Sequence, residues 1–364
     1  MDKTKTNIVF VKENIEENTL TENTPPVNIS PVNISLVEAQ QKFVQAVPMR
    51  HMAAETCDLS LALGRTLYHN VLAPMDAPPY HRAIVEGYLV HTASTASATE
   101  AAPAAFKIVG SILPGDTNVP SFGQTEALTI VTGSLIPSGA YSAIRPWDAQ
   151  RQGEVVSVNR PFPPRFFIED QGCDIKKGAL LLEAGMVLQP QQLGLLAGLG
   201  IRQIDVAKAP KLTLFSSGNE VIPHTEPFRI GCIYDSNAIM LAAAARQAGA
   251  MVEFVGIMND NFENFVAQLT RILPTTDMVV ISGGTAVGGR DFITDLIKAV
   301  GDVLINGIPM KSGRPLIMGM AGKKPIVCVA GHPPEALRGF TLFGVAAINR
   351  LLGRNAELPL DAAT

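Results

Sequence analysis

The spacing of apolar and polar positions changes several times along this chain, and each change predicts a different kind of element. Ser35 and Glu38 form an S-x-x-E capping box, and apolar residues follow at helical spacing. This pattern predicts a helix that begins directly after Ser35. Residues 59–72 are also apolar at helical spacing and predict a second helix, which ends before the proline-containing stretch 73–80.

Short alternating runs replace the helical pattern after the prolines. Residues 86–92, 105–112 and 126–133 are apolar runs of strand length, separated by Gly, Pro and small polar residues. They predict a small β module. A turn-rich β segment follows, and a further helix is expected near residues 190–200 because Pro190 stands at its start.

After Lys208, apolar runs of strand length alternate with amphipathic helical stretches as far as the end of the chain. Such alternation is typical of a parallel sheet with helices on both faces. The predicted fold class is therefore multidomain α/β: an elongated α+β domain with an inserted small β domain, followed by a parallel-sheet α/β domain. The expected boundaries are a flexible leader at 1–34, a discontinuous first domain at 35–77 and 148–207, the insertion at 78–147, the α/β domain at 208–354 and a tail at 355–364.

Composition and charge exclude several classes of protein. The net charge is −4 with scattered lysines, which argues against a nucleic-acid-binding face. We expect no membrane span, since no stretch runs for about eighteen apolar residues, and no secretion signal. The four cysteines are widely separated, which favours neither a disulfide framework nor a zinc site and points to the cytoplasm.

Four glycine- and hydroxyl-rich loops follow predicted strands of the α/β domain or precede its helices. They are SSGNE, YDSN, SGGTAVGGRD and AGHPPE, which begin at residues 216, 234, 282 and 330. In open α/β sheets, ligands bind beyond the carboxyl ends of the strands, where glycines let the backbone approach an anion closely. None of the four is a Walker or Rossmann motif.

These loops, with ALGRTLYHNVLAPMDAPPYHRAIVEGYLV, IVTGSLIPSGA and MKSGRPLIMG, resemble the molybdopterin molybdenumtransferase family, which includes the corresponding domain of gephyrin. The resemblance runs from about residue 36 to 353. It implies an L-shaped homodimer that binds adenylylated molybdopterin and, with Mg2+ and molybdate, releases AMP to give molybdenum cofactor. Molybdopterin adenylyltransferase and molybdoenzyme-assembly proteins are the implied partners.

The chain departs from the family pattern at several positions. Glu86, Asn219 and His332 stand where the family has Asp, Asp and Asn, while Cys173 replaces an acidic residue and Ala286 replaces a serine. The further small β domain that the family usually carries is not expected, because only ten residues follow Arg354. These departures leave two hypotheses open: a working molybdenumtransferase, or a diverged paralogue, weakly active or inactive, that binds molybdopterin or assists assembly.

The resemblance and the chemistry of the loops together select the candidate residues. Carboxylates suit a hard cation, and basic residues suit phosphate or molybdate oxygens. The candidate catalytic residues are Glu86, Asp291, Lys311 and Arg314, and the candidate Mg2+ ligands are Glu86, Asp235 and Asp291. The candidate cofactor-binding residues are Thr132, Ser217, Gly218, Asn219, Glu220, Asp235, Ser236, Ser282, Gly283, Gly284 and His332.

Each candidate also has a purely structural interpretation. Asp235 with Ser236 would cap the helix that follows, and Thr132 would be a turn residue before Gly133. Glu86 would be a solvated edge carboxylate, and His332 would make a local hydrogen bond in its turn. Lys311 and Arg314 would be ordinary surface charges.

Overall fold

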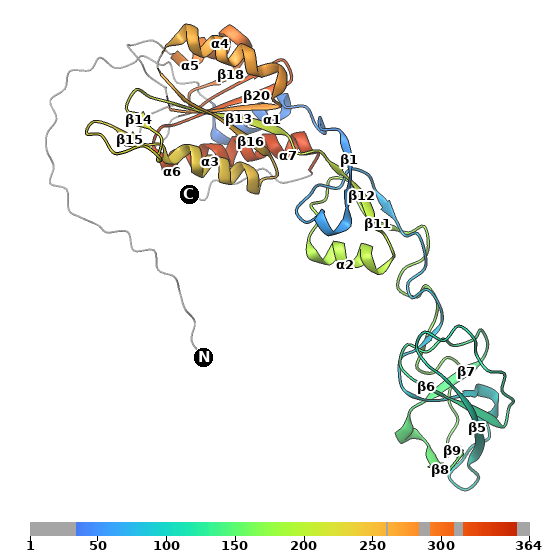
Figure 1. The fold of residues 1–364 in the computed structure, drawn as a ribbon. Helices are drawn as coiled ribbons and strands as arrows, with labels where there is room; N and C mark the ends of the chain where they lie inside the picture. Colours follow the sequence, from blue (N-terminus) through green and yellow to red (C-terminus); the bar gives the residue numbers. More distant parts are fainter. Residues whose placement is uncertain (1–33, 260, 284–291, 309–315, 355–364) are drawn as a thin grey trace.

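The computed structural model describes residues 34–259, 261–283, 292–308 and 316–354, and these residues form an elongated molecule (Figure 1). An α/β part, made of α1 and the elements from β13 onward, lies at one end. A small middle part contains β1, β11, β12 and α2. A distal β part, built around β4 to β9, lies at the other end. Within the described residues, no helix has the length and apolar character needed to cross a bilayer.

The α/β part is built on a six-stranded sheet. Its strands, in spatial order, are β16 (Met251–Met258), β13 (Lys211–Ser217), β17 (Met278–Ser282), β20 (Lys324–Val329), β19 (Ile317–Ala321) and β18 (Asp302–Asn306). The first four are parallel, as the alternation of strand and helix predicts. β19 runs antiparallel to both of its neighbours, β20 and β18, so the sheet is mixed.

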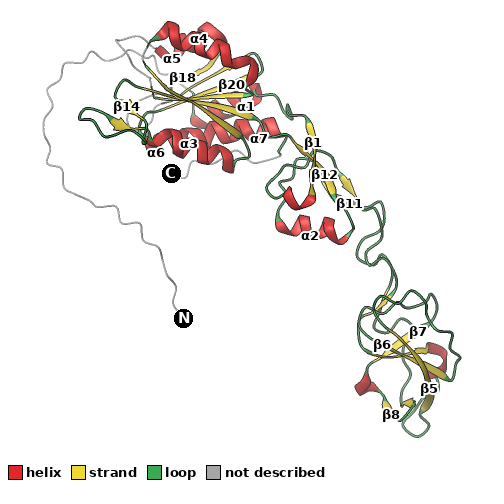
Figure 2. Ribbon diagram, in the orientation of Figure 1, coloured by secondary structure: helices red, strands yellow, loops and turns green. Residues whose placement is uncertain are grey.

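Helices cover both faces of this sheet (Figure 2). One face carries α4 (Phe262–Ile272) and α5 (Phe292–Val300). The other carries α1 (Leu36–Ala46), α3 (Ser236–Gln247), α6 (Pro333–Gly339), the π-helix η5 (Phe340–Val345) and α7 (Ala346–Leu352). Side chains alternate along the strands, so Leu214 packs with α3 and α7 while its neighbour Phe215 packs with α4.

The capping box predicted at Ser35 is present, because the Ser35 hydroxyl accepts a hydrogen bond from the backbone of Glu38 and the Glu38 carboxylate accepts one from Ser35. The side chains that this helix packs against are far from it in the chain. Phe43 is fully buried in the core of the α/β part, where its ring centroid lies 6.0 Å from that of Phe343. The helical pattern identifies an apolar face but not the element that covers it.

The middle part holds two short antiparallel pairs and one helix. β1 (Ala54–Asp58) pairs with β12 (Gln203–Ala207), β2 (Val71–Leu72) pairs with β11 (Leu180–Leu182), and α2 spans Pro190–Gly198, as predicted. The helix expected over 59–72 is wrong. A 3-10 turn, η1 (Leu59–Leu61), and the strand β2 form there instead, since Gly64 has a φ of 74° and the N–H of Leu67 donates to the carbonyl of Met186.

The distal part is a six-stranded sheet ordered β7 (Tyr141–Ile144), β4 (Gly87–His91), β6 (Glu126–Ile130), β5 (Ala104–Ile112), β9 (Val155–Val158) and β8 (Gln150–Gln152). It contains the three strands expected from the alternating runs. Because β8 and β9 belong to it, the sheet continues past residue 147, where the sequence analysis ends the insertion. The chain enters and leaves through β3 (Arg82–Ala83) paired with β10 (Ile168–Glu169). The division of the chain into domains stays a prediction.

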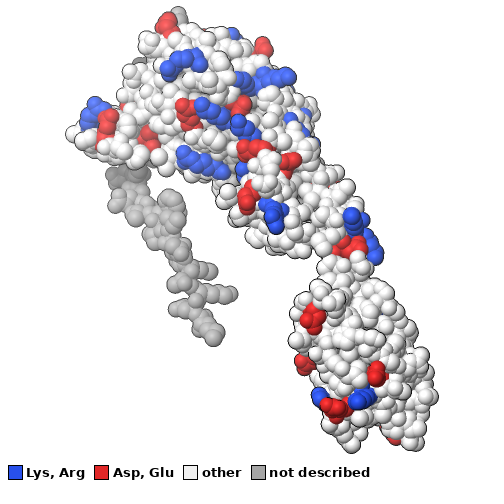
Figure 3. All heavy atoms as spheres, turned by 45° about the vertical axis from the view of Figure 1, so that its right-hand side comes forward, with Lys and Arg blue, Asp and Glu red and all other residues white. Residues whose placement is uncertain are grey.

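Charged side chains of both signs are mixed over the face in Figure 3. Lys and Arg (blue) lie next to Asp and Glu (red) over the α/β and middle parts, and the distal part shows few charges on this face. Ion pairs between oppositely charged neighbours occur in the α/β part, such as that of Lys211 with Glu253 at 2.6 Å. On this face, positive charge is offset locally rather than collected in one region.

Candidate functional site

Three predicted loops leave the α/β sheet at the same edge. In the strand register, Ser216 of β13 pairs with Ser282 of β17, and Ser282 pairs with Val329 of β20. The N–H of Gly283 donates to the carbonyl of Val329 at 3.1 Å, which holds the start of its loop against β20. The carboxyl ends of these parallel strands therefore place Ser217, Ser282 and the 330–335 loop side by side.

The fourth loop joins this edge through a short pair of parallel strands. β14 (Val221–Ile222) pairs with β15 (Ile233–Tyr234), and the N–H of Ile233 donates to the carbonyl of Glu220 at 2.8 Å. The loop that carries Asn219 and Glu220, both exposed, is thus held next to the loop that starts α3. Sequence-distant motifs are brought together here by parallel-strand topology.

Gly218 occupies a position that needs glycine. Its φ is 143°, and a Cβ atom there would lie 2.8 Å from a methyl group of Val221 and 3.0 Å from the Glu220 carboxylate. A side chain would push against both neighbours. The absence of one lets the backbone turn sharply at the end of β13.

Asp235 caps α3, which confirms its structural interpretation. Its Oδ1 accepts a hydrogen bond from the N–H of Ala238 at 2.9 Å, and its own N–H donates to the carbonyl of Ile222. The residue is 6% exposed. Its Oδ2 is buried and accepts no hydrogen bond from any described residue. An ionised carboxylate oxygen is costly to bury without a partner. Capping therefore explains the position of Oδ1 but leaves the burial of Oδ2 unexplained. Ser236, the next residue, is exposed.

Asn237 is a residue of this edge that sequence reasoning missed. Its Nδ2 donates to the Ser282 hydroxyl and to the Gly331 carbonyl, both at 2.8 Å, so it ties α3 to the ends of β17 and β20. It is 7% exposed. The available signal was its place in the YDSN motif, which puts it in the first turn of α3, the helix that Asp235 caps.

His332 lies at the start of α6 and is exposed. Its backbone precedes Pro333 at the first helical position, and its side chain makes no capping hydrogen bond. The 330–335 loop reaches the strand edge through the Gly331 carbonyl, which Asn237 binds. The local hydrogen bond of residue 332 is made by its backbone carbonyl, which accepts from the N–H of Ala336 at 2.9 Å.

Glu86 and Thr132 lie in the distal part, at the end of the molecule opposite to the α/β part and its strand edge (Figure 1). Glu86 is exposed and directly precedes β4. Thr132 is exposed in a turn closed by the hydrogen bond from Ser134 N–H to the Val131 carbonyl at 2.9 Å, which fits its structural interpretation as a turn residue. One chain alone does not bring these two residues to Asp235.

Four predicted site residues lie outside the described residues: Gly284, Asp291, Lys311 and Arg314. Among the residues that are described, no three His, Cys, Asp or Glu side chains gather into a set that could hold a metal ion.

Cys173 lies in the two-stranded connection between the middle and distal parts. Its thiol is 3.8 Å from Oδ1 of Asp174, and the pKa of the thiol is raised by desolvation and by that neighbouring carboxylate. Nearby, Asp76 accepts hydrogen bonds from the N–H of Lys177 and from Gln171, and the first of these lowers the pKa of the Asp76 carboxyl. The thiol is therefore neutral where the family pattern has a negative charge.

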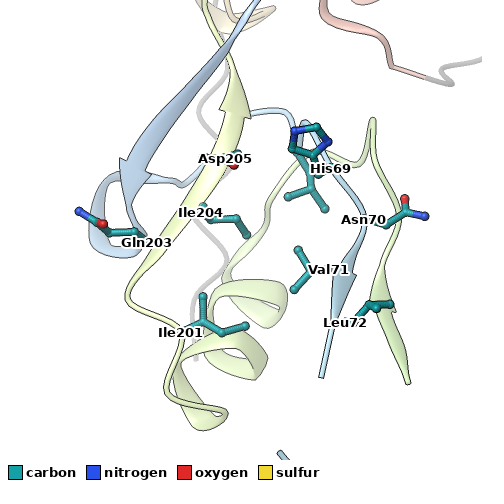
Figure 4. A pocket seen from close by; sticks show the side chains of 9 residues that line it. His69, Asn70, Val71, Leu72, Ile201, Gln203, Ile204 and Asp205 are labelled. Carbon is teal, nitrogen blue, oxygen red and sulfur yellow. The ribbon is translucent and has the colours of Figure 1, made fainter. Parts of the chain in front are cut away.

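A separate cavity of about 250 Å³ lies in the middle part, lined by Val71, Ile201 and Ile204 with His69 at its rim (Figure 4). The carboxylate of Asp205 at this cavity already accepts from the Thr56 hydroxyl at 2.8 Å. The cavity has a mixed polar and apolar lining, and no hydroxyl residue or glycine is among the residues that line it.

Comparison with known proteins covers nearly all of the described chain. Residues 34–200 match the family described as the MoeA N-terminal region (domain I and II), and residues 213–350 match one described as a probable molybdopterin binding domain. Molybdopterin molybdenumtransferase 2 of Mycobacterium tuberculosis is 32% identical over 314 residues, which are 84% of this chain and 77% of that protein. The molybdopterin molybdenumtransferase of Staphylococcus epidermidis is 25% identical over 319 residues, 87% of this chain and 76% of the relative.

A solved structure gives the same result in three dimensions. The molybdopterin biosynthesis MoeA protein from Pyrococcus horikosii superposes with a TM-score of 0.78 at 32% identity, covering 89% of this chain and 81% of that chain. Fold, motif order and sequence identity agree over the α/β, middle and distal parts. The chain is therefore a member of the molybdopterin molybdenumtransferase family.

Proposed function

We propose that this protein inserts molybdate into adenylylated molybdopterin with release of AMP. The observation that carries the proposal is the strand edge itself, where the Ser282 hydroxyl, the glycine turn at Gly218 and the unpartnered Asp235 Oδ2 gather beside the amino end of α3. Helix amino ends and backbone N–H groups favour phosphate oxygens. An adenylylated ligand with its diphosphate fits that chemistry.

The donor set also fits Mg2+. A buried carboxylate oxygen without a hydrogen-bond partner among the described residues is the hard oxygen ligand that this ion prefers. Asp235 would hold it together with Asp291 and with Glu86 from a second copy of the chain. When bound, Mg2+ supplies charge neutralisation at phosphate oxygens. Lys311 and Arg314 would bind oxygens of molybdate or phosphate, and Ser217, Ser282 and Thr132 would donate hydrogen bonds to them.

A homodimer follows from the separation of the candidates. Glu86 and Thr132 lie at the far end of their own chain, so a site that contains them and Asp235 needs two copies. The middle part offers apolar surface for such contact: Leu61 is 74% exposed, Leu63 58% and Leu72 56%. Burying side chains of this size stabilises an association by roughly 1.5–3 kcal/mol each when burial is complete.

The chemistry also defines neighbours in the reaction sequence. An adenylyltransferase must supply the adenylylated substrate, and an assembly protein or apoenzyme must accept the product. We place the reaction in the cytoplasm, in agreement with four cysteines that form no disulfide with one another.

The test is AMP release by the purified protein from adenylylated molybdopterin, with molybdate and Mg2+ present and with each left out in turn. Release that requires molybdate supports the transferase. Tight binding of the substrate without release of AMP would instead identify a molybdopterin-binding protein. If the protein neither binds the substrate nor releases AMP, the proposal is contradicted.

A further inference from the structure

We propose that Asn237 is a positioning residue, which turns the Ser282 hydroxyl into a dedicated hydrogen-bond donor for an oxygen atom of the anionic ligand. The inference rests on the proposed function, and it assigns a role to a residue outside the candidate set drawn from the sequence.

The first step is the orientation of the Asn237 amide. Its nitrogen lies 2.8 Å from the Gly331 carbonyl oxygen, an atom that can only accept. The reverse orientation would place the amide oxygen against that carbonyl, which is repulsive. The Gly331 carbonyl therefore fixes Nδ2 in place, and the same nitrogen lies 2.8 Å from Oγ of Ser282.

The second step is the direction of the Ser282 hydrogen bond. An amide nitrogen only donates, so Oγ of Ser282 must be the acceptor in its bond with Asn237. The hydroxyl proton is then free to donate elsewhere. Within the part of the chain that is described, the bond with Asn237 is the one side-chain hydrogen bond found for Ser282, so that proton has no acceptor there.

The third step is burial. Ser282 is 3% exposed and Asn237 is 7% exposed, so bulk water does not readily satisfy them. Ser216, the register partner of Ser282, is also 3% exposed, and its Oγ is buried without a hydrogen-bond partner among the described residues. Oδ1 of Asn237 shares that condition. Buried polar atoms are normally paired, and two serine hydroxyls without an acceptor among the described residues indicate that a polar ligand completes them.

The fourth step is the chemical class of that ligand. Ser216 and Ser282 occupy paired positions on the sheet face covered by α3, below its amino end. Two hydroxyl donors beside the amino end of a twelve-residue helix suit an anionic oxygen, such as one of a phosphate. Asn237 contributes without touching this oxygen, because it holds the serine in the donating arrangement.

The experiment is a double-mutant cycle on full-length protein with Ser282→Ala and Asn237→Asp, measured as affinity for adenylylated molybdopterin by calorimetry. Ser282→Ala should weaken binding about ten- to hundredfold, the cost of a lost hydrogen bond to a charged group. Asn237→Asp should weaken binding comparably, because a carboxylate accepts the serine proton for itself. In the Ser282→Ala background, the loss caused by Asn237→Asp should shrink to the repulsion between its new carboxylate and the anionic ligand. Ser282→Thr, which keeps the hydroxyl, should restore most of the affinity.

If Asn237 served only to stabilise the fold, the variants would behave differently. Each substitution would lower the melting temperature while leaving the affinity of the folded fraction unchanged, and that result would overturn the inference. Fully additive losses of affinity would do so as well. If Asn237→Asp does not fold, Asn237→Ala takes its place in the cycle, since it also removes the bond that fixes Ser282.

The experiment also distinguishes failure of this inference from failure of the proposed function. If wild-type protein does not bind adenylylated molybdopterin, the cycle is repeated with AMP and with inorganic phosphate. A Ser282 effect on either probe that depends on Asn237 supports the inference even then. No effect of Ser282→Ala on any of the three probes contradicts it.

Discussion

Gly283 lies directly against the backbone of Ser217: a Cβ atom at residue 283 would stand 2.5 Å from the Ser217 carbonyl oxygen. The φ of Gly283 is 89°, a value that other residues rarely adopt. The close approach of β17 to β13 at the strand edge therefore depends on the absence of a side chain. Gly283→Ala should lower the free energy of unfolding by about 1–3 kcal/mol, which denaturant titration measures.

Gly322→Ala is the matched control for this variant. Gly322 also has a positive φ, 60°, but no atom lies within 4 Å of the position its Cβ would take. Gly322→Ala should therefore lower the free energy of unfolding by about 1 kcal/mol, through backbone strain alone. Equal losses in the two variants would show that the contact with Ser217 does not constrain the edge.

Asp148 gives a pH-dependent prediction in the distal part. Its Oδ2 accepts from Arg145 at 2.7 Å and its Oδ1 from Arg160 at 3.0 Å, and the side chain is 14% exposed. The bond from Arg145, chiefly, lowers the pKa of the Asp148 carboxyl below its ordinary 3.8. A depressed pKa in the folded state adds stability above the unfolded pKa, and this stability is lost as the pH falls through the folded value.

Asp148→Asn should therefore lower the free energy of unfolding at neutral pH by about 1 kcal/mol. The difference between variant and wild type should shrink as the pH falls below 3.8, the ordinary value for this group. Asp295→Asn is the control, because Asp295 pairs with Lys298 at 3.6 Å with half of its side chain exposed and should have little effect. A constant difference across the acid range would refute the ion-pair account.

Variants of Asn219 test whether the absence of a carboxylate at this position weakens cation binding. Asn219 is exposed on the loop after β13, next to Glu220. If the protein uses Mg2+ there, Asn219→Asp should raise Mg2+-dependent AMP release, because a carboxylate is a better ligand for a hard cation than an amide. Asn219→Ser, which removes the amide without adding charge, is the control. A gain in both variants, or in neither, would argue against a role for this position in cation binding.

Mixed dimers test whether the site is shared between two copies. Co-assembly of a Glu86→Ala chain with an Asp291→Asn chain leaves one site unchanged when each site takes one residue from either copy. Such heterodimers should recover about half of the wild-type activity, while each variant alone is inactive. The measurement is the rate of AMP release by dimers purified with two different tags. Absence of complementation in confirmed heterodimers would remove the support for a shared site.

The sequence predicts most elements correctly where local signals are strong. The capping box at Ser35, the helix after Pro190 and the apolar runs that form β13, β17 and β20 depend on near neighbours in the chain. The helix over residues 59–72 fails because tertiary pairing overrides its periodicity: Thr66 bridges Val187, and Leu67 bridges Val206.

The same distinction applies to the site. Motif order predicts which loops matter, and the parallel strands then bring Ser217 and Ser282 to one edge. Asn237 was missed because its hydrogen-bond partners are 45 and 94 residues away, a relationship that spacing within a motif does not encode. The sequence likewise does not indicate how far Glu86 lies from Asp235 in space. That separation becomes visible only in the elongated arrangement of the parts (Figure 1).

The most direct test of the central claim is the balance between AMP and molybdenum in a single-turnover reaction. Purified protein is mixed with adenylylated molybdopterin, Mg2+ and molybdate, and both the AMP released and the molybdenum bound to molybdopterin are quantified over time. The proposed function predicts that the two appear together and in equal amounts, and that neither appears without molybdate. AMP released in the absence of molybdate, with no molybdenum on the pterin, would contradict it.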